Sequence, residues 1–509
     1  MDGDFDVLVV GGGVGGAYAA WRLATGPVGP GSPLPPNPAD RRVALVELSD
    51  RIGGRLESLV PPGMQNLRAE FGGMGFTNND KLVHALADLF GLATGPFVLG
   101  GPSNLYYLRG VRFKVAQSTD PTVVPYRLAA DEQRIDPRLL VPTAVEKVFP
   151  GSSSWTQQQW DQATSKPYDG RSLNDLGFWN FLLMNMSNEA LSYARDAYGH
   201  FFEVANWNCA QALPWFMGDG ASSYSTLVDG YDQLPLTLAE SFAEAGGQTF
   251  MSTQVTSVEQ QATGPQGQST MVVTSAAGDT ATATAVVLAL PRRALELISV
   301  PVLEEPTARE LVTSVTGQHV MKLFCCYDEP WWSQLGITGG PSGTDLPIGQ
   351  VWYFGPDSSS NESSLLLASY NDTLDTTFWE GAASGPRYQP SEPADADPHW
   401  LEQAPSALMV EQAQAQLAEV HGLSTIPDPY SAAWIDWSQD PYGGAFNTWN
   451  VGVDADAVAA AMLQPDPSVP LYVCGEAYSH DQGWVEGALD TAEQVVELLG
   501  VDAPEWVST

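Results

Sequence analysis

Apolar and polar positions along this chain fall into blocks typical of strands and helices packed in an α/β fold. The clearest block is an apolar run of β-branched character at residues 5–10, which predicts a buried strand. It breaks into consecutive glycines, and apolar positions at helical spacing follow from Val14 onward. A proline- and glycine-rich loop at residues 26–40 precedes a second strand predicted over residues 42–47.

Later blocks alternate between strand-like and helix-like patterns. A helix through residue 245 is followed by strand patterns at residues 249–258, 269–275 and 283–290. The chain ends with a strand over residues 469–475 and a helix over residues 486–499. Helical patterns are best at residues 174–186 and 189–204, and the remaining blocks are strand-like runs at 321–327, 350–354 and 365–370 and a helix at 405–421.

These blocks predict an α/β fold in which one nucleotide-binding domain is interrupted twice. Its three segments are expected at residues 1–75, 222–299 and 456–509. A second domain with a mixed sheet takes residues 76–129 and 300–455, and a helical domain takes residues 130–221.

The glycine turn after the first strand has the spacing of a dinucleotide fingerprint. Gly11 would serve the tight turn, Gly13 the close approach of backbone to a pyrophosphate, and Gly16 the packing of helix on strand. The helix N-terminus would present N–H groups and a positive dipole end to the phosphates. Glu47 ends the second strand and suits a ribose hydroxyl pair. Glu47 lies farther from the last fingerprint glycine than the usual ~20 residues, because the loop at 26–40 is inserted between them.

The residues after Glu47 indicate which dinucleotide is bound. Residues 51–55 read Arg-Ile-Gly-Gly-Arg. Here the sequence resembles the flavin-containing amine oxidase superfamily, in which an acidic residue is followed by R-x-G-G-R. The resemblance implies a Rossmann-like FAD-binding domain of the glutathione-reductase/amine-oxidase type, with Arg55 near the FAD diphosphate. A nicotinamide cofactor would leave the arginine–glycine cluster unexplained.

Two further motifs extend the resemblance toward the L-amino acid oxidases. Residues 227–235 resemble the G-x-D-x-L-P segment before the second FAD strand, where Val255 would hold the adenine edge through its backbone. A glycine turn with Pro235 in a helical first turn explains the local shape equally well. Residues 471–477 and 482–488 resemble the Y-x-G-E and G-W-x-x-G-A motifs. By this resemblance the C-terminal FAD contacts are Gly475, Glu476, Gly483, Trp484 and Val485.

Trp484 and Val485 would stand at a helix N-terminus facing flavin N1 and O2, where N–H groups stabilise negative charge. The Trp484 ring would form one wall of the substrate pocket. Lys322 lies in an apolar strand pattern ahead of an aromatic pair, as does a lysine of related oxidases that holds a water next to flavin N5. A buried lysine needs partners and has a lowered pKa. A lysine reaching solvent from a strand edge is the alternative.

Substrate contacts are expected from aromatic residues. Trp434, Trp437 and the Gly-Gly-Ala sequence ending at Ala445 resemble the family's second aromatic wall. Monoamine oxidases, which belong to the same superfamily, attach their flavin through a cysteine near this wall. No cysteine lies in this segment here, so the resemblance implies that FAD is bound non-covalently. Tyr353 matches a tyrosine that contacts the substrate carboxylate. Gly75 stands where many L-amino acid oxidases have a carboxylate-binding arginine, for which Arg109 and Arg112 are candidate replacements.

The composition of the chain limits the classes of molecule that the protein is expected to bind. The net charge of −38 disfavours nucleic acid and anionic membranes and is typical of a salt-adapted or a reconstructed sequence alike. No segment has the ~20 continuous apolar residues of a membrane helix, and no signal peptide precedes the first strand, so we expect a cytoplasmic protein. The cysteines show no metal spacing, and Cys325 and Cys326 would point to opposite faces of a strand.

Together these features favour an FAD-dependent L-amino acid oxidase. Lys322, Tyr353 and Trp484 are the candidate catalytic residues. The expected small-molecule partners are an apolar or aromatic L-amino acid and O2. The resemblance alone implies a homodimer. A monoamine or polyamine oxidase, which needs no carboxylate clamp, and a flavoprotein with an acceptor other than oxygen remain as alternatives.

Overall fold

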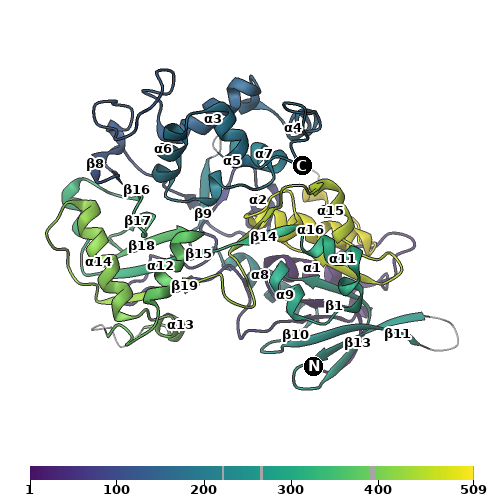
Figure 1. The fold of residues 1–509 in the computed structure, drawn as a ribbon. Coiled ribbons are helices and arrows are strands. Elements are labelled where there is room, and N and C mark those ends of the chain that lie inside the picture. Colours follow the sequence, from purple (N-terminus) through teal and green to yellow (C-terminus); the bar gives the residue numbers. More distant parts are fainter. Residues whose placement is uncertain (220–222, 264–267, 390–395, 508–509) are drawn as a thin grey trace.

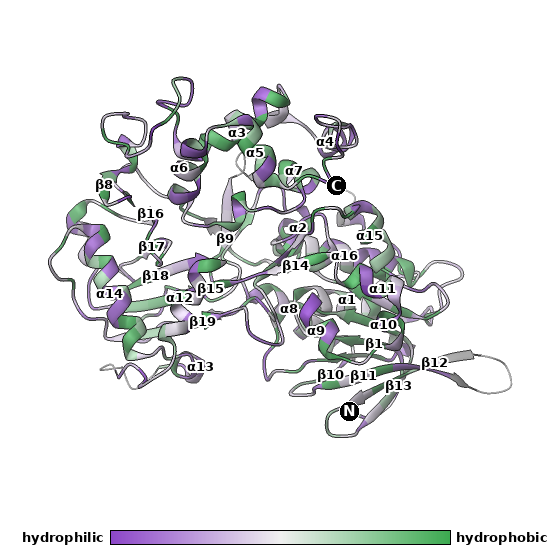
Figure 2. Ribbon diagram, viewed as in Figure 1, coloured by the Kyte–Doolittle hydropathy of each residue, from purple (hydrophilic) through white to green (hydrophobic). Residues whose placement is uncertain are grey.

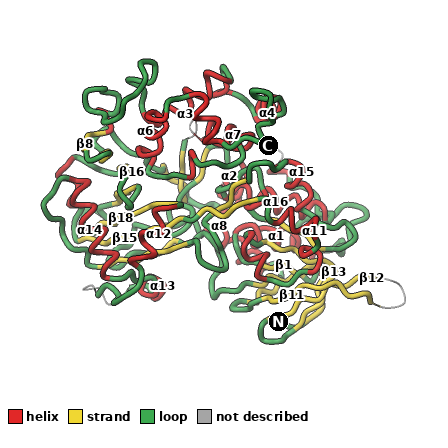
Figure 3. The backbone as a smooth tube through the Cα atoms, in the orientation of Figure 1, coloured by secondary structure: helices red, strands yellow, loops and turns green. Residues whose placement is uncertain are grey.

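A computed structural model describes residues 1–219, 223–263, 268–389 and 396–507. Figure 1 shows two sheet-containing lobes side by side, with a layer of helices covering one side of both. The tube in Figure 3 shows strands along the lower edge of the right-hand lobe, below its helices, and strands beside α12 and α14 in the left-hand lobe. The predicted α/β fold with a helical insertion is confirmed. The predicted boundary between residues 221 and 222 lies outside the described residues.

The first lobe is built on a seven-stranded sheet. Its order is β10–β2–β1–β13–β12–β11, and β21 also pairs with β13. Its strands come from three separated parts of the chain: β1 (Gly3–Val10) and β2 (Val43–Val46), then β10 (Gln248–Phe250), β11 (Val255–Thr263), β12 (Gln268–Ser275) and β13 (Thr280–Ala289), and finally β21 (Leu471–Cys474). The pairs of β1 with β2 and β13, β2 with β10, and β13 with β21 are parallel, whereas β11, β12 and β13 pair antiparallel.

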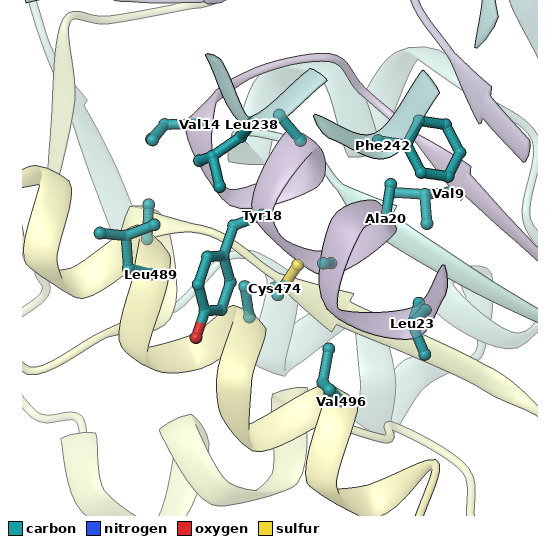
Figure 4. Close-up of a cluster of buried hydrophobic side chains, with 14 of the residues drawn as sticks. Val9, Val14, Tyr18, Ala20, Leu23, Leu238, Phe242, Cys474, Leu489 and Val496 are labelled. Atoms are coloured by element: carbon teal, nitrogen blue, oxygen red, sulfur yellow. The ribbon is translucent and has the colours of Figure 1, made fainter. Parts of the chain in front are cut away.

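Both faces of this sheet are covered, which explains the continuous apolar run of β1. Val7 and Val9 pack into a core with α1 (Val14–Thr25), α8 (Gln233–Glu244) and α16 (Val485–Leu498). Figure 4 shows Tyr18 of α1 directed toward α16, where its hydroxyl donates to Glu493 at 2.7 Å. The other face is covered by α9 (Arg292–Leu297), α10 (Pro301–Glu304), α11 (Pro306–Val312) and α15 (Ala455–Met462).

The second lobe carries another seven-stranded sheet, in the order β19–β15–β18–β17–β16–β7–β8. The strands are β7 (Leu105–Leu108), β8 (Val111–Lys114), β15 (Val320–Tyr327), β16 (Gly340–Thr344), β17 (Gln350–Phe354), β18 (Ser364–Asp372) and β19 (Ser431–Asp436). One face packs against α12 (Leu374–Ala382) and α14 (Ala407–His421), with α13 (Pro398–Glu402) nearby. Figure 2 shows apolar residues concentrated along the central strands.

The helical insertion has its own core and consists of α3 (Pro137–Val148), α4 (Gln157–Thr164), α5 (Phe178–Asn185), α6 (Asn188–Tyr198) and α7 (Cys209–Asp219). Small sheets join the layers: β3 (Ser58–Leu59) with β4 (Ala69–Glu70), β14 (Val315–Gln318) with β20 (Phe446–Trp449), and β9 (Tyr224–Leu227) between β5 (Phe76–Thr77) and β6 (Thr94–Pro96). Helix α2 (Lys81–Phe90) contacts α16 and α8.

Two predicted elements differ in the structure. The single strand predicted over residues 249–258 is divided into β10 and β11, because Ser252 takes a positive φ of 50° and the chain turns there. The helix predicted over residues 189–204 ends at Tyr198, where Gly199 caps it in the left-handed conformation. A short 3-10 turn, η4 (Phe202–Val204), follows.

Candidate functional site

The three predicted fingerprint glycines have different surroundings. A Cβ on Gly16 would lie 1.8 Å from the carbonyl oxygen of Gly11, so only glycine lets α1 approach β1 this closely. Gly11 has a φ of +107°, and a Cβ there would meet the Ala289 oxygen at 2.4 Å. A Cβ on Gly13 would meet no protein atom within 4 Å. Gly13 therefore presents open backbone at the N-terminus of α1, as an approaching phosphate requires.

This open backbone lines a first cavity of about 320 Å³, which we call the cofactor cavity. The structure brings all but one of the predicted cofactor residues to it; Gly16 lies behind its wall. The predicted residues that line the cofactor cavity are Gly11, Gly13, Glu47, Arg55, Val255, Gly475, Glu476, Gly483, Trp484 and Val485. They come from the three chain segments that form the first sheet.

Two carboxylates hold the walls of the cofactor cavity in place. Glu47 accepts a hydrogen bond from the Gly12 amide at 2.6 Å and joins the end of β2 to the glycine turn. Glu476 is 5% exposed and accepts from the Asn447 amide at 2.6 Å. It also lies 3.0 Å from the Arg55 guanidinium, which donates to the Ala445 oxygen at 2.8 Å. The open glycine turn, the Glu47 carboxylate and the Arg55 guanidinium suit a nucleotide cofactor with a phosphate over Gly13.

A second cavity of about 820 Å³, which we call the substrate cavity, meets the first. Both are lined by Gly73, Phe446, Gly483, Trp484 and Val485, so the two cavities join at the N-terminus of α16. The aromatic residues that line the substrate cavity are Phe97, Tyr106, Tyr198, Phe202, Trp215, Tyr224, Tyr231, Trp352, Tyr370, Phe446 and Trp484.

The N-terminus of α16 leaves backbone N–H groups at this junction that can donate to a hydrogen-bond acceptor. Trp484 is the N-cap residue and makes no side-chain cap, so the first amides of the helix are left for another partner. Glu486, in the first turn, instead accepts from the Leu82 and Val83 amides of α2 at 2.8 and 3.1 Å. Burial raises the pKa of Glu486 to about 7.

Lys322 is buried, with 2% of its surface exposed. Its Nζ donates to the Glu70 and Gly72 carbonyl oxygens at 2.9 and 2.5 Å and lies 4.8 Å from the centre of the Tyr370 ring. Burial lowers the pKa of Lys322 to about 7, and nearby Glu70 opposes the shift. Gly72 and Tyr370 line the substrate cavity, whereas Lys322 lies behind them. Its predicted contact with water beside the flavin stays a prediction.

Tyr353 does not reach the substrate cavity, and the predicted contact with substrate is corrected. Its hydroxyl is buried and hydrogen-bonded to Ser342 Oγ at 2.9 Å and to His421 Nε2 at 2.7 Å. Side chains alternate along β17, so Tyr353 enters the core beneath α14 while the preceding Trp352 faces the cavity.

The predicted second aromatic wall is also corrected. Trp437 is 1% exposed and donates to the Phe71 oxygen at 2.8 Å, and Trp434 packs against the core on the α14 face. Neither lines either cavity, whereas Ala445 lines the cofactor cavity. Phe446 and Phe202 take their place, with ring centres 4.7 Å apart. The sequence signals were Phe446 directly after Ala445 and an aromatic pair just past the end of α6.

Asp372, which we did not predict, positions part of this wall. Its two carboxylate oxygens accept from the Phe201 and Phe202 amides at 2.8 and 2.7 Å. These bonds dock η4 of the helical insertion onto the end of β18. Burial raises the pKa of Asp372 to about 7.

Gly75 lines the substrate cavity but has no room for a side chain. A Cβ there would lie 2.6 Å from the Ser225 oxygen of β9. The two candidate replacements lie elsewhere: Arg109 pairs with Glu189 at 2.9 Å, and Arg112 donates to the Val420 oxygen at 2.7 Å. Arg109 and Arg112 therefore do not supply a carboxylate-binding cation in place of the arginine absent at Gly75.

Arg138 is the one arginine or lysine among the described residues that line the substrate cavity. Its Nε and Nη2 donate to the two carboxylate oxygens of Asp136 at 3.1 and 3.2 Å. The cation at this cavity is therefore already engaged by an acidic neighbour.

The remaining predictions concern cysteines and membranes. All four cysteines are free and buried, and Cys325 and Cys326 enter opposite cores, as predicted. Among the described residues, no helix is long and apolar enough to cross a membrane, and no group of three or more histidine, cysteine or acidic side chains forms a metal site.

Thermal stability is expected to fall as the pH is raised from 5 to 8. Asp372 and Glu486 would titrate near pH ~4 in the unfolded chain but have pKa values of about 7 in the folded protein. Their stabilising contribution is complete below the unfolded pKa and is lost as the pH rises through the folded pKa. Calorimetry should show a Tm lower by about 5 °C at pH 8 than at pH 5. A Tm that rises over this interval would contradict the assignment.

Comparison with known proteins identifies the family. The sequence pattern of the family described as flavin containing amine oxidoreductase matches residues 19–499. Aplysianin-A from Aplysia kurodai is 26% identical over 97% of this chain and 90% of its own. An L-amino-acid oxidase from Bungarus fasciatus is 24% identical over 74% of this chain and 67% of its own.

A solved structure of a putrescine oxidase double mutant has the same fold. Its TM-score is 0.70 at 16% identity, and the match covers 98% of this chain and 99% of that one. The sequence match spans nearly the whole chain, including the α16 N-terminus at which the two cavities join. The chain belongs to the flavin-containing amine oxidoreductase family.

Proposed function

We propose that the protein is an FAD-dependent L-amino acid oxidase acting on apolar or aromatic amino acids. Per substrate molecule, one O2 and one water would be consumed, and one 2-oxo acid, one ammonia and one H2O2 would be formed. The observation that carries the proposal is the junction of an aromatic-lined cavity with the cofactor cavity at Trp484 and Val485. The similarity to L-amino-acid oxidases supports the substrate class.

The shape of the cofactor cavity favours FAD over a mononucleotide. Its lining extends from the α16 N-terminus past Gly13 to Glu47, just after β2, and to Val255 at the start of β11. Glu47 would hold a ribose, Arg55 the diphosphate, and the Val255 backbone the adenine. No cysteine is among the described residues that line either cavity, and Ala445 stands in the cofactor wall, which supports non-covalent binding.

The residues of this chain would prepare the substrate for oxidation. Bound FAD would supply the electron acceptor for the hydride at the substrate Cα and would pass the electrons to O2. The Trp484, Phe446 and Phe202 rings would hold an apolar side chain and exclude water. The first amides of α16 would stabilise negative charge at the junction. Lys322, held by two carbonyl oxygens, would place positive charge behind this wall.

An amine without a carboxylate is the second candidate substrate. The space at Gly75 admits no cationic side chain, and the guanidinium of Arg138 is already bound to Asp136. Glu203 adds a further acidic group to the cavity lining, which favours a positively charged amine. A monoamine or polyamine oxidase is consistent with these three observations.

A substrate panel separates the two candidates. Purified holoenzyme is expected to produce H2O2 with L-phenylalanine at a kcat/KM at least about tenfold above that with phenethylamine or spermidine. The difference has a physical reason, because a pocket that bonds a substrate's polar group discriminates against analogues lacking it. Peroxide formed with the amines but with none of the L-amino acids would establish the amine oxidase instead.

A further inference from the structure

The substrate cavity contains a buried histidine that the proposed chemistry has not yet used. His200 is 6% exposed and lines the cavity beside Tyr370, with the two ring centres 4.3 Å apart. Its Nε2 is buried and has no hydrogen-bond partner among the described residues. A buried polar atom without a partner costs roughly 1–3 kcal/mol, so a ligand that completes the bond would be favoured.

A chain of hydrogen bonds fixes which nitrogen of His200 carries the proton. The Trp352 indole donates to Gln350 Oε1 at 2.7 Å, which orients the amide. Gln350 Nε2 donates to the Tyr198 oxygen at 2.5 Å and lies 3.4 Å from His200 Nδ1. An amide nitrogen can only donate, so Nδ1 accepts, and the neutral ring carries its proton on Nε2.

The charge state of His200 agrees with this arrangement. Burial lowers the pKa of His200 to about 3, and the Tyr370 main chain, which lies beside the ring without completing a hydrogen bond to Nε2, opposes the shift only in part. The ring is therefore neutral at neutral pH. Glu203 lies on the Nδ1 side, with its Oε1 3.9 Å from that nitrogen. Nε2–H is thus a neutral donor on the other side of the ring.

An α-carboxylate in this cavity needs such a donor. Gly75 has no space for an arginine, and Arg138 is engaged by Asp136. We propose that His200 Nε2–H donates a hydrogen bond to the substrate carboxylate and that Gln350 and Trp352 position it. This inference rests on the proposed L-amino acid substrate, and it makes His200 a specificity-determining residue.

The test measures the Kd of two ligands of similar shape, 3-phenylpropionate, which has a carboxylate, and propylbenzene, which has none. Binding to the oxidised holoenzyme is followed by the change in flavin absorbance. His200→Phe is expected to raise the Kd of 3-phenylpropionate about 10- to 100-fold, the range of a hydrogen bond to a charged group. The Kd of propylbenzene should change less than about threefold, because no hydrogen bond is lost. His200→Gln, which restores an N–H donor, should recover most of the carboxylate affinity.

His421→Gln is the matched control, because His421 is also buried and neutral but lines neither cavity. It should leave both Kd values unchanged. If His200→Phe does not fold, His200→Asn is too short to reach the carboxylate and makes the same comparison. An unchanged Kd for 3-phenylpropionate, or equal changes for both ligands, would overturn the inference.

Failure of the proposed function is recognised separately, because ligand binding needs no turnover. If wild-type enzyme oxidises no L-amino acid but His200→Phe selectively weakens 3-phenylpropionate, the proposed function is wrong and the carboxylate contact stands. If the wild type oxidises L-phenylalanine and His200→Phe leaves its KM unchanged, the function stands and the His200 contact is wrong.

Discussion

Gly16→Ala is expected to abolish flavin loading and to destabilise the protein by about 3 kcal/mol or more. The added Cβ would lie 1.8 Å from the Gly11 oxygen and 3.1 Å from the Ala289 side chain. These neighbours belong to the glycine turn and the end of β13, and backbone atoms cannot move aside as a flexible side chain can. The measurements are Tm and the ratio of absorbance at 450 nm to that at 280 nm.

Gly13→Ala provides the matched control three residues away. A Cβ at Gly13 meets no protein atom, so the apoprotein should keep its Tm. The methyl group would instead occupy the space over which the cofactor phosphate is proposed to lie, so flavin affinity should fall at least about tenfold. Equal losses of apoprotein stability in the two variants would contradict the different roles assigned to these glycines.

Lys322→Met is expected to slow reoxidation of the reduced flavin by O2 about 100-fold, while reduction by substrate changes much less. The physical reason is the loss of a buried positive charge behind the wall of the substrate cavity. Because Nζ also satisfies the Glu70 and Gly72 oxygens, the variant should lose roughly 1–3 kcal/mol of stability. Stopped-flow mixing of anaerobically reduced enzyme with O2 measures the rate directly.

Lys81→Met, which changes an exposed lysine of α2, is the control and should reoxidise at the wild-type rate. In the wild type, the protonated fraction of Lys322 falls as the pH rises through about 7, so the reoxidation rate should fall over the same interval. Equal rates in Lys322→Met and wild type would remove this role. Slow reoxidation in both would favour an acceptor other than oxygen.

The cofactor half of the site could be predicted from sequence because its geometry is local. The apolar residues of β1, the glycine turn and α1 are consecutive, and each glycine role follows from a fixed spacing. The Trp484–Val485 helix start is equally local. The three segments of the first sheet followed from repeated strand patterns, and β17 and α14 were found close to their predicted positions.

The substrate half depends on contacts between distant segments, and there the sequence was less informative. Tyr353 and Trp352 are neighbours on β17, and only the packing of α14 decides which of them faces the cavity. Phe202 reaches the cavity because Asp372, far along the chain, binds its amide. The lack of space at Gly75 arises from β9, a pairing partner that periodicity does not reveal.

The β7–β8 hairpin was also missed, although it has a local cause. Arg109 and Gly110 form a two-residue connection in which both residues have positive φ, 50° and 75°. Such a turn matches the twist of the flanking strands. Arginine is rare in this conformation, so the sequence gives a weaker turn signal than asparagine–glycine would.

The most direct test of the central claim is anaerobic mixing of the oxidised holoenzyme with L-phenylalanine, followed at 450 nm. An L-amino acid oxidase should bleach its flavin fully and form one phenylpyruvate per flavin, with D-phenylalanine inactive. A flavin that stays oxidised with every L-amino acid but is bleached by phenethylamine or spermidine would contradict the account.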